Sequence, residues 1–273
     1  MKLHRALLRA QCAALDLLQL DHRGEVAELA TLHNRLPNSG GFTPTATIAQ
    51  QAEEVVRGVS DGARRSVGEA GFEGLALDDA LAYTSRWKHF SFFRQSRAID
   101  RIARQVATGA ATVLELGCGG GDMGHFLGIL GVPGYVGVEG NALAFRFSPF
   151  IAERPRHFHC LNLQQEIDFG RAFTVVCSFE VLEHIPESSL DGILATIRNH
   201  MGPNSVFLGT ASLQDDLDVH VTVRERGFWL AAFARHGLVP HENASWQREI
   251  EAGHAFNWHA GNTNVFVLKR SSR

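Results

Sequence analysis

The sequence predicts an α/β protein: a doubly wound, mostly parallel β-sheet with an N-terminal helical region in front of it. Two observations lead to this fold class. From about residue 112 onward, short apolar runs alternate with amphipathic segments of helical length. In addition, the first of these runs ends in the glycine-rich stretch "ELGCGGGD", residues 115–122. Alternation of strands and helices is typical of a parallel sheet covered by helices on both faces.

The individual elements follow from the apolar runs and the glycine stops. We expect strands at 112–117, 134–140, 157–163, 173–179, 204–212 and 262–270. Helices are expected at 121–130, 188–201 and 223–237, the last of which ends at a glycine.

The chain before the first strand has a different character. It contains helical segments at about 3–35, 45–59 and 86–106, and a loop rich in proline and glycine follows the first of them. We therefore divide the chain into an N-terminal helical region, 1–85, and an α/β domain, 86–273. Residues 1–85 are expected to cover the pocket, contact the substrate or form a homodimer interface.

Composition excludes several classes of protein. The net charge is −3 over 273 residues, so the basic stripe of a nucleic-acid-binding protein is not expected. No apolar run has membrane-spanning length. The four cysteines have neither disulfide-like nor metal-like spacing, which is typical of a reduced, cytoplasmic protein. Neither Cys118 nor Cys177 has a neighbour that marks it as a nucleophile.

The glycine stretch and the second strand together predict a nucleotide-type ligand. Gly117, Gly119 and Gly121 let the backbone turn tightly and approach a ligand closely. Glu139, at the end of the next strand, can accept both hydroxyl protons of a ribose. A dinucleotide fingerprint would place a diphosphate at the following helix N-terminus, where Asp122 stands here. That carboxylate argues against an NAD-dependent oxidoreductase.

With these residues assembled, the sequence resembles the class I S-adenosylmethionine (SAM)-dependent methyltransferases. "VLELGCGGGDMG" is similar to their first motif, "YVGVEGN" to the second and "FTVVCSFEVLEHIP" to the fourth, in the subgroup with "EVLEH". The resemblance implies a Rossmann-like, seven-stranded sheet. It also implies the ribose on Glu139, the methionine end near Glu115 and the adenine near Asn162. The positions that it assigns to the cofactor are Glu115, Gly117, Cys118, Gly119, Gly121, Glu139, Gly140, Asn141, Asn162, Leu163, Phe179 and Glu180.

The stretch "SFEVLEHIP", residues 178–186, should border the reacting centre because it follows the fourth predicted strand. Three interpretations remain open. Glu183 and His184 can form a surface turn with no chemical role, or His184 can be a general base. Alternatively, a resemblance to small-RNA 2′-O-methyltransferases and ubiquinone-pathway O-methyltransferases implies a Mg²⁺ or Mn²⁺ site. Its ligands would be Glu180, Glu183, His184 and, after the fifth strand, His220.

We therefore expect a cytoplasmic methyltransferase that uses SAM to methylate a small-molecule acceptor, most simply on oxygen. Most of the catalysis would come from holding acceptor and methyl group in line. The alternatives are a catalytically inactive SAM-binding partner subunit, an RNA 2′-O-methyltransferase and the NAD-dependent oxidoreductase. No membrane association is expected.

Overall fold

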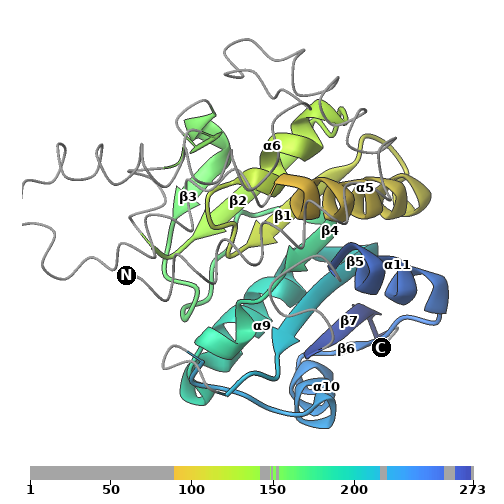
Figure 1. The fold of residues 1–273 in the computed structure, drawn as a ribbon. Helices are drawn as coiled ribbons and strands as arrows, with labels where there is room; N and C mark the ends of the chain where they lie inside the picture. The colour runs from red at the N-terminus through yellow and green to blue at the C-terminus, as the bar shows by residue number, and fades with distance from the viewer. Residues whose placement is uncertain are drawn as a thin grey trace, which may run out of the picture.

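The computed structural model describes residues 89–141, 148, 150–151, 154–215, 220–254 and 262–271. The expectations for the N-terminal region 1–85, including its role as a lid or a dimer interface, lie outside these residues. The described part of the chain forms one sheet with helices on both faces (Figure 1).

The sheet has seven strands in the order β3-β2-β1-β4-β5-β7-β6. Adjacent strands are parallel except where β7 pairs with β5 and β6. This order confirms the prediction of a Rossmann-like, doubly wound and mostly parallel sheet. The strands are β1 Thr112–Leu116, β2 Gly134–Glu139, β3 Phe158–Cys160, β4 Phe173–Ser178, β5 Met201–Ser212, β6 Leu238–Pro240 and β7 Thr263–Arg270.

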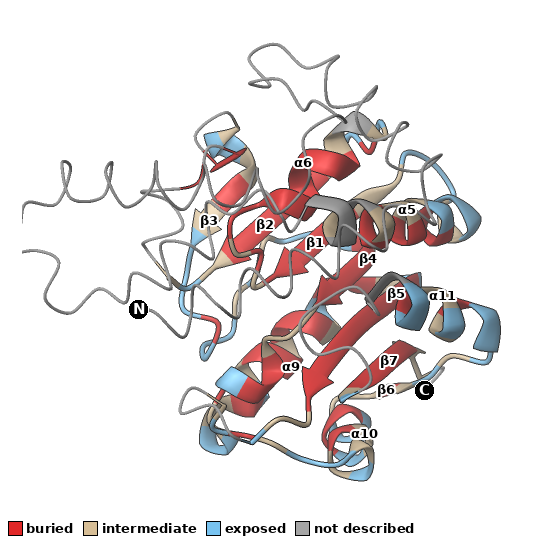
Figure 2. Ribbon diagram, viewed as in Figure 1, coloured by how far each residue is buried: buried red, intermediate tan, exposed pale blue. Residues whose placement is uncertain are grey.

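Two layers of helices enclose this sheet. The helices α5 His89–Val106, α6 Asp122–Ile129 and α11 Ala244–His254 pack on one face, and α9 Leu190–Asn199 and α10 Arg226–Arg235 pack on the other. Each face has its own apolar cluster, and the central strands between the two are mostly buried (Figure 2). Along β1, for example, Val113 packs toward α5 and Leu114 toward α9. Burial on both faces explains why these strands read as continuous apolar runs.

Short elements depart from the sequence-based expectation. The strand expected at 157–163 is only three residues long and follows a 3₁₀ turn, η3 Pro155–His157. Strand β6 and helix α11 were not predicted. A three-residue strand has too little alternation to be recognised, and its pairing with β7 arises only in the folded sheet. Among the described helices, none combines the length and apolar composition that crossing a bilayer requires.

Candidate active site

The sheet order places a crevice at the carboxyl ends of β1 and β4. After β1 the chain adds β2 and β3 on one side, whereas β4 and β5 lie on the other. In open α/β sheets, ligands bind where the strand order reverses in this way. The residues that follow β1, β2 and β4 are therefore the candidates for the site.

The glycine loop after β1 is tied to the neighbouring strand. The amides of Gly117 and Cys118 both donate to the carbonyl of Val138, at 2.7 and 2.9 Å. Gly117, Gly119 and Gly121 all have positive φ, at 80°, 52° and 77°, so a side chain at any of them would be strained. A Cβ on Gly117 would also lie 2.2 Å from a methyl group of Val181. This packing explains why the sequence has glycine there.

Glu139 closes the loop from the end of β2. Its Oε2 accepts the amide of Gly119 at 2.9 Å, and its Oε1 accepts the amide of Asn141 at 2.8 Å. Burial raises the pKa of this carboxyl, whereas the amides of Asn141, Gly119 and Gly140 act in the opposite direction. Each carboxylate oxygen can accept a second hydrogen bond. The carboxylate is thus oriented by the backbone and suited to a diol, which fits the ribose of SAM.

The segment after β3 presents mainly polar side chains and backbone groups to a ligand in the crevice. Asn162 is exposed, and its side-chain oxygen accepts the amide of Gln164 at 3.0 Å. Leu163 is buried in the apolar cluster on the side of the sheet covered by α9. The predicted contacts of Asn162 and Leu163 with adenine remain predictions.

Glu115 lies beneath the glycine loop. It is buried in β1 and accepts a hydrogen bond from the hydroxyl of Tyr135 on β2. Burial raises the pKa of Glu115 to about 8; the bond from Tyr135 lowers it, and the charges of Asp122 and Glu139 raise it further. Burial likewise raises the pKa of the Cys118 and Cys177 thiols, which disfavours a nucleophilic thiolate at either position.

The turn after β4 holds a glutamate in an uncommon conformation. Among the described non-glycine residues, Glu180 is the one with a positive φ, at 54°. Its amide donates to the Thr210 hydroxyl of β5 at 2.9 Å, and its Oε1 accepts the Thr263 hydroxyl of β7 at 2.8 Å. Phe179, beside it, packs against the cluster beneath α5. Hydroxyls from two other strands therefore fix the end of β4.

Glu183 belongs to the short 3₁₀ turn η4, Leu182–His184, and its side chain is fully buried. The interpretation of this residue as part of a surface turn is therefore wrong. Within the described structure, neither carboxylate oxygen makes a hydrogen bond of normal geometry. Burial, followed by the charge of Glu180, raises the pKa of Glu183 to about 8, and the nearby amides of Glu183 and Ser212 lower it.

Two histidines meet Glu183 at the rim of the site. One ligand atom each from Glu183, His184 and His220 lies within 4.8 Å of the others. The two imidazole rings are 4.7 Å apart between centroids, in an edge-to-face arrangement. Nδ1 of His220 lies 2.7 Å from the carbonyl oxygen of Gln214. Because a carbonyl can only accept, that nitrogen donates its proton, and Nε2 of the neutral ring carries the lone pair.

The segment that brings His220 to η4 is held by one buried threonine. The amide of Thr222 donates to the carbonyl of Glu183 at 2.9 Å, and its hydroxyl donates to the carbonyl of Ile185 at 2.7 Å. The prediction that His220 lies at the same rim as His184 is confirmed. The supporting residues Thr210, Thr222 and Thr263 were missed, since an isolated threonine in a strand or loop carries no pattern that identifies its partner.

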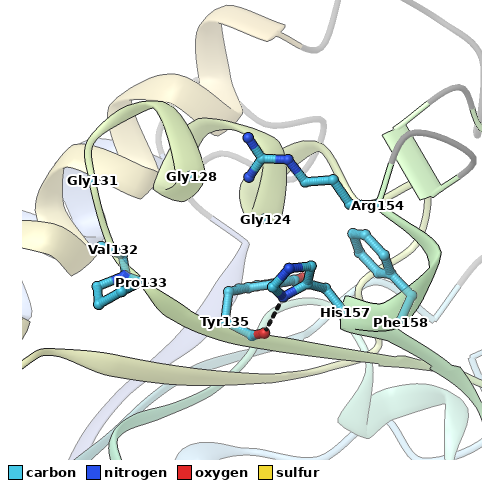
Figure 3. Close-up of a pocket in the computed structure, with 9 residues that line it drawn as sticks. All are labelled: Gly124, Gly128, Gly131, Val132, Pro133, Tyr135, Arg154, His157 and Phe158. Atoms are coloured by element: carbon cyan, nitrogen blue, oxygen red, sulfur yellow. Dashed lines mark hydrogen bonds between the residues drawn. The ribbon is translucent and has the colours of Figure 1, made fainter.

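A separate cavity of about 360 Å³ lies between α6 and the edge of the sheet (Figure 3). In it, the ring nitrogen Nδ1 of His157 donates to the carbonyl of Tyr135 at 3.0 Å. The loop before β2 forms one wall, so the cavity lies at the amino end of that strand and is distinct from the crevice at the carboxyl ends. Its lining consists of Gly124, Gly128, Gly131, Val132, Pro133, Tyr135, Arg154, His157 and Phe158.

Comparison with known families gives the class of this protein. A family model described as "Methyltransferase domain" matches residues 89–258, which is more than half of the chain. The chain therefore belongs to the methyltransferase-domain family, and it is a class I SAM-dependent methyltransferase, as the motifs indicated. No curated protein matches the chain.

The chain is also similar to solved methyltransferase structures, of which the first shares the fold with a TM-score above 0.5. A TehB-like SAM-dependent methyltransferase from Corynebacterium glutamicum is 18% identical, with a TM-score of 0.54, over 72% of this chain and 100% of that one. The amino pentose methyltransferase CalS10 from Micromonospora echinaspora is 17% identical, with a TM-score of 0.49, over 66% and 92%. The sugar N-methyltransferase KedS8 from Streptoalloteichus is 15% identical, with a TM-score of 0.48, over 66% and 88%.

Proposed function

We propose that this methyltransferase transfers the methyl group of SAM to an oxygen of a small-molecule acceptor beside η4, with a divalent metal ion at that turn. The observation that carries the proposal is the convergence of Glu183, His184 and His220 within 4.8 Å at the rim of the crevice. No single element of the chain supplies all three residues.

For the cofactor, the proposal assigns the loop Gly117–Gly121 and Glu139 to the adenosyl part. The carboxylate of Glu139 is already oriented by two amides, so its remaining acceptor sites suit the two ribose hydroxyls. Gly140 and Asn141 continue this wall, and Asn162 is proposed to bind the adenine amino group. Bound SAM supplies the electrophilic methyl group, and the protein contributes mainly alignment of the two reactants.

The donor set at η4 fits a cation. A fully buried carboxylate without hydrogen bonds of normal geometry in the described structure is costly unless something neutralises it. The bond from His220 Nδ1 to Gln214 fixes the ring so that the lone pair of the neutral imidazole resides on Nε2, as in many metal-binding histidines. Two imidazoles and one carboxylate suit Mn²⁺, Fe²⁺ or Zn²⁺ better than Mg²⁺.

Glu180 lies outside this group of three, although its charge raises the pKa of Glu183. We retain it as a candidate fourth ligand. A bound divalent ion would lower the pKa of an acceptor hydroxyl and stabilise its oxyanion. His184, the exposed member of the group, is the alternative proton acceptor if no ion binds. The net charge of −3 supports a small acceptor rather than RNA.

The test is calorimetric titration of Mg²⁺, Mn²⁺, Fe²⁺ and Zn²⁺ into chelator-treated protein saturated with S-adenosylhomocysteine (SAH). We expect one ion to bind stoichiometrically and its affinity to fall at least tenfold in Glu183→Gln and His220→Ala. Glu187→Gln is the matched control, because that exposed glutamate lies in the next turn, η5 Glu187–Ser189, outside the group of three. Absence of binding by all four ions would rule out the metal site, and a pH–rate profile of His184→Gln would then test the base.

A further inference from the structure

Gln95 on α5 is a buried amide that the site described so far does not use. Gln95 is 0% exposed. Within the described structure, neither its Nε2 nor its Oε1 has a hydrogen-bond partner. A buried carboxamide of this kind has lost its bonds to water without replacement, which folded proteins seldom tolerate. A ligand that offers both an acceptor and a donor would satisfy it.

Gln95 lies beside the end of the sheet at which the glycine loop begins. Gln95, Ile99 and Ile102 follow one another at helical spacing, and all are fully buried. Ile99 and Ile102 belong to the cluster on the sheet, so Gln95 extends the sheet-facing stripe of α5 by one turn toward its N-terminus.

Helix geometry gives the position of that turn along the direction of the strands. α5 ends at Val106 and β1 begins at Thr112, so the helix returns along the sheet antiparallel to β1. The helix from Gln95 to Val106 rises about 16 Å, and β1 rises about the same distance. Gln95 is thus level with the carboxyl end of β1, where the glycine loop begins.

A contact of the next residue supports this placement independently. The hydroxyl of Ser96 donates to the carbonyl of Phe92 at 2.7 Å and lies 3.4 Å from the carbonyl oxygen of Met123. Met123 belongs to the first turn of α6, directly after the glycine loop. This part of α5 therefore borders the loop that we assign to the cofactor.

We infer that Gln95 binds the amino-acid end of SAM. This inference rests on the proposed placement of SAM on the glycine loop. The methionine end of SAM carries a carboxylate, which accepts hydrogen bonds, next to an ammonium group, which donates them. Nε2 of Gln95 would donate to the carboxylate and Oε1 would accept from the ammonium group. Glu115 lies on the same face of β1 as Val113, which packs toward α5, and its carboxyl oxygen would accept a hydrogen bond from the ammonium group.

Two ligands separate this role from a purely structural one. SAH contains the amino-acid end, whereas 5′-methylthioadenosine has the same adenosyl group and sulfur without it. Calorimetry would give Kd for both ligands with the wild-type chain, Gln95→Met and Ser96→Ala. Methionine has nearly the shape of glutamine but neither donor nor strong acceptor, and Ser96 is the adjacent residue whose hydroxyl is already bonded within α5.

We expect Gln95→Met to weaken the binding of SAH about ten- to hundredfold, which is the usual effect of losing hydrogen bonds to charged groups. Binding of 5′-methylthioadenosine should stay within about twofold, and Tm should not fall, because an apolar group replaces a buried amide. Ser96→Ala should leave the ratio of the two Kd values unchanged. If Gln95→Met does not fold, Gln95→Glu should show the same selective loss, since its charge repels the carboxylate.

Unchanged SAH affinity in these variants, or an equal loss for both ligands, would overturn the inference alone. Failure of the wild-type chain to bind either SAH or 5′-methylthioadenosine would overturn the proposed cofactor site, and this inference with it. The two failures are therefore distinguishable.

Discussion

At the scale of single residues, the site contains two buried carboxyl groups whose environment favours the protonated form. The pKa of Glu115 and that of Glu183 are each raised to about 8, chiefly by burial. The two differ in their partners. Glu115 accepts a hydrogen bond from Tyr135, whereas Glu183 lies beside two histidines and another glutamate. We therefore expect Glu115 to affect stability and Glu183 to be neutralised by a bound ion.

The sign of the pH dependence follows from the raised pKa of Glu115. In the unfolded chain this carboxyl ionises near its ordinary pKa of 4.5, but in the folded chain it ionises only near pH 8. Between these values the folded state binds more protons than the unfolded state, so its stability falls as pH rises. The penalty is absent below pH 4.5 and complete above pH 8.

Glu115→Gln should remove this part of the pH dependence. The amide oxygen can still accept the bond from Tyr135, and no charge has to be buried. We expect the variant and the wild type to have the same unfolding free energy near pH 5. Near pH 8.5 the unfolding free energy of the variant should be higher, on the order of a few kcal/mol. Urea denaturation at both pH values measures the difference; Glu183, unchanged in both proteins, cancels from the comparison. The prediction would be contradicted if the unfolding free energies of the wild type and the variant changed equally between the two pH values.

At the scale of elements, the loop between β1 and α6 depends on both backbone conformation and close packing. Gly117→Ala would place a Cβ 2.2 Å from Val181 in addition to requiring a φ of +80°. Gly131→Ala is a matched control, since its φ is +85° but nothing lies within 4 Å of the added atom. The pair separates steric overlap from backbone strain.

We expect Gly131→Ala to lower the unfolding free energy by about 1 kcal/mol, the usual cost of a non-glycine residue in the left-handed region. Gly117→Ala should lose a further 1–3 kcal/mol or so through overpacking, and it should weaken SAH binding by displacing the loop. Thermal denaturation and calorimetry measure the two effects. Similar losses of stability in both variants, with SAH affinity intact, would show that the contact with Val181 has little importance.

The turn η4 shows how one element obtains partners from several others. Glu183 and His184 come from the turn itself, His220 from the segment after β5, and Thr263 reaches Glu180 from β7. Thr222 joins that segment to η4 through two hydrogen bonds. The geometry of the proposed metal site is therefore a property of the packing of β4, β5 and β7.

At the scale of the whole molecule, the fold predicts which cofactor stabilises the protein. A ligand that binds only the folded state, present at a hundred times its Kd, adds about 2.7 kcal/mol to the unfolding free energy. For a domain of this size that corresponds to a rise in Tm of about 5–10 °C. We expect SAH to give this shift and NAD to give none, because Asp122 at the N-terminus of α6 opposes a diphosphate. A shift with NAD would contradict the assignment of the cofactor.

The amino-acid sequence was sufficient to predict the fold class and the cofactor class. Both depend on local patterns: apolar runs of strand length, glycines at alternate positions after the first strand, and a carboxylate at the end of the second. Such patterns reflect backbone conformation and burial within a single element, and they are the basis on which Glu139 and the glycine loop are proposed to bind the cofactor. The short strand β6 was missed because three residues contain too little pattern.

Which polar side chains face one another became clear only from the folded chain. Sequence suggested His220 as a partner of His184, but only the packing of β4 and β5 brings His220 to the buried Glu183 and its chain neighbour His184. Gln95 had no signal in the sequence, since a glutamine in a helix is usually exposed, and its burial arises from the docking of α5 on the sheet. The physical reason is that burial and long-range hydrogen bonds depend on residues far apart in the chain, whereas helix and strand formation depends mainly on neighbours.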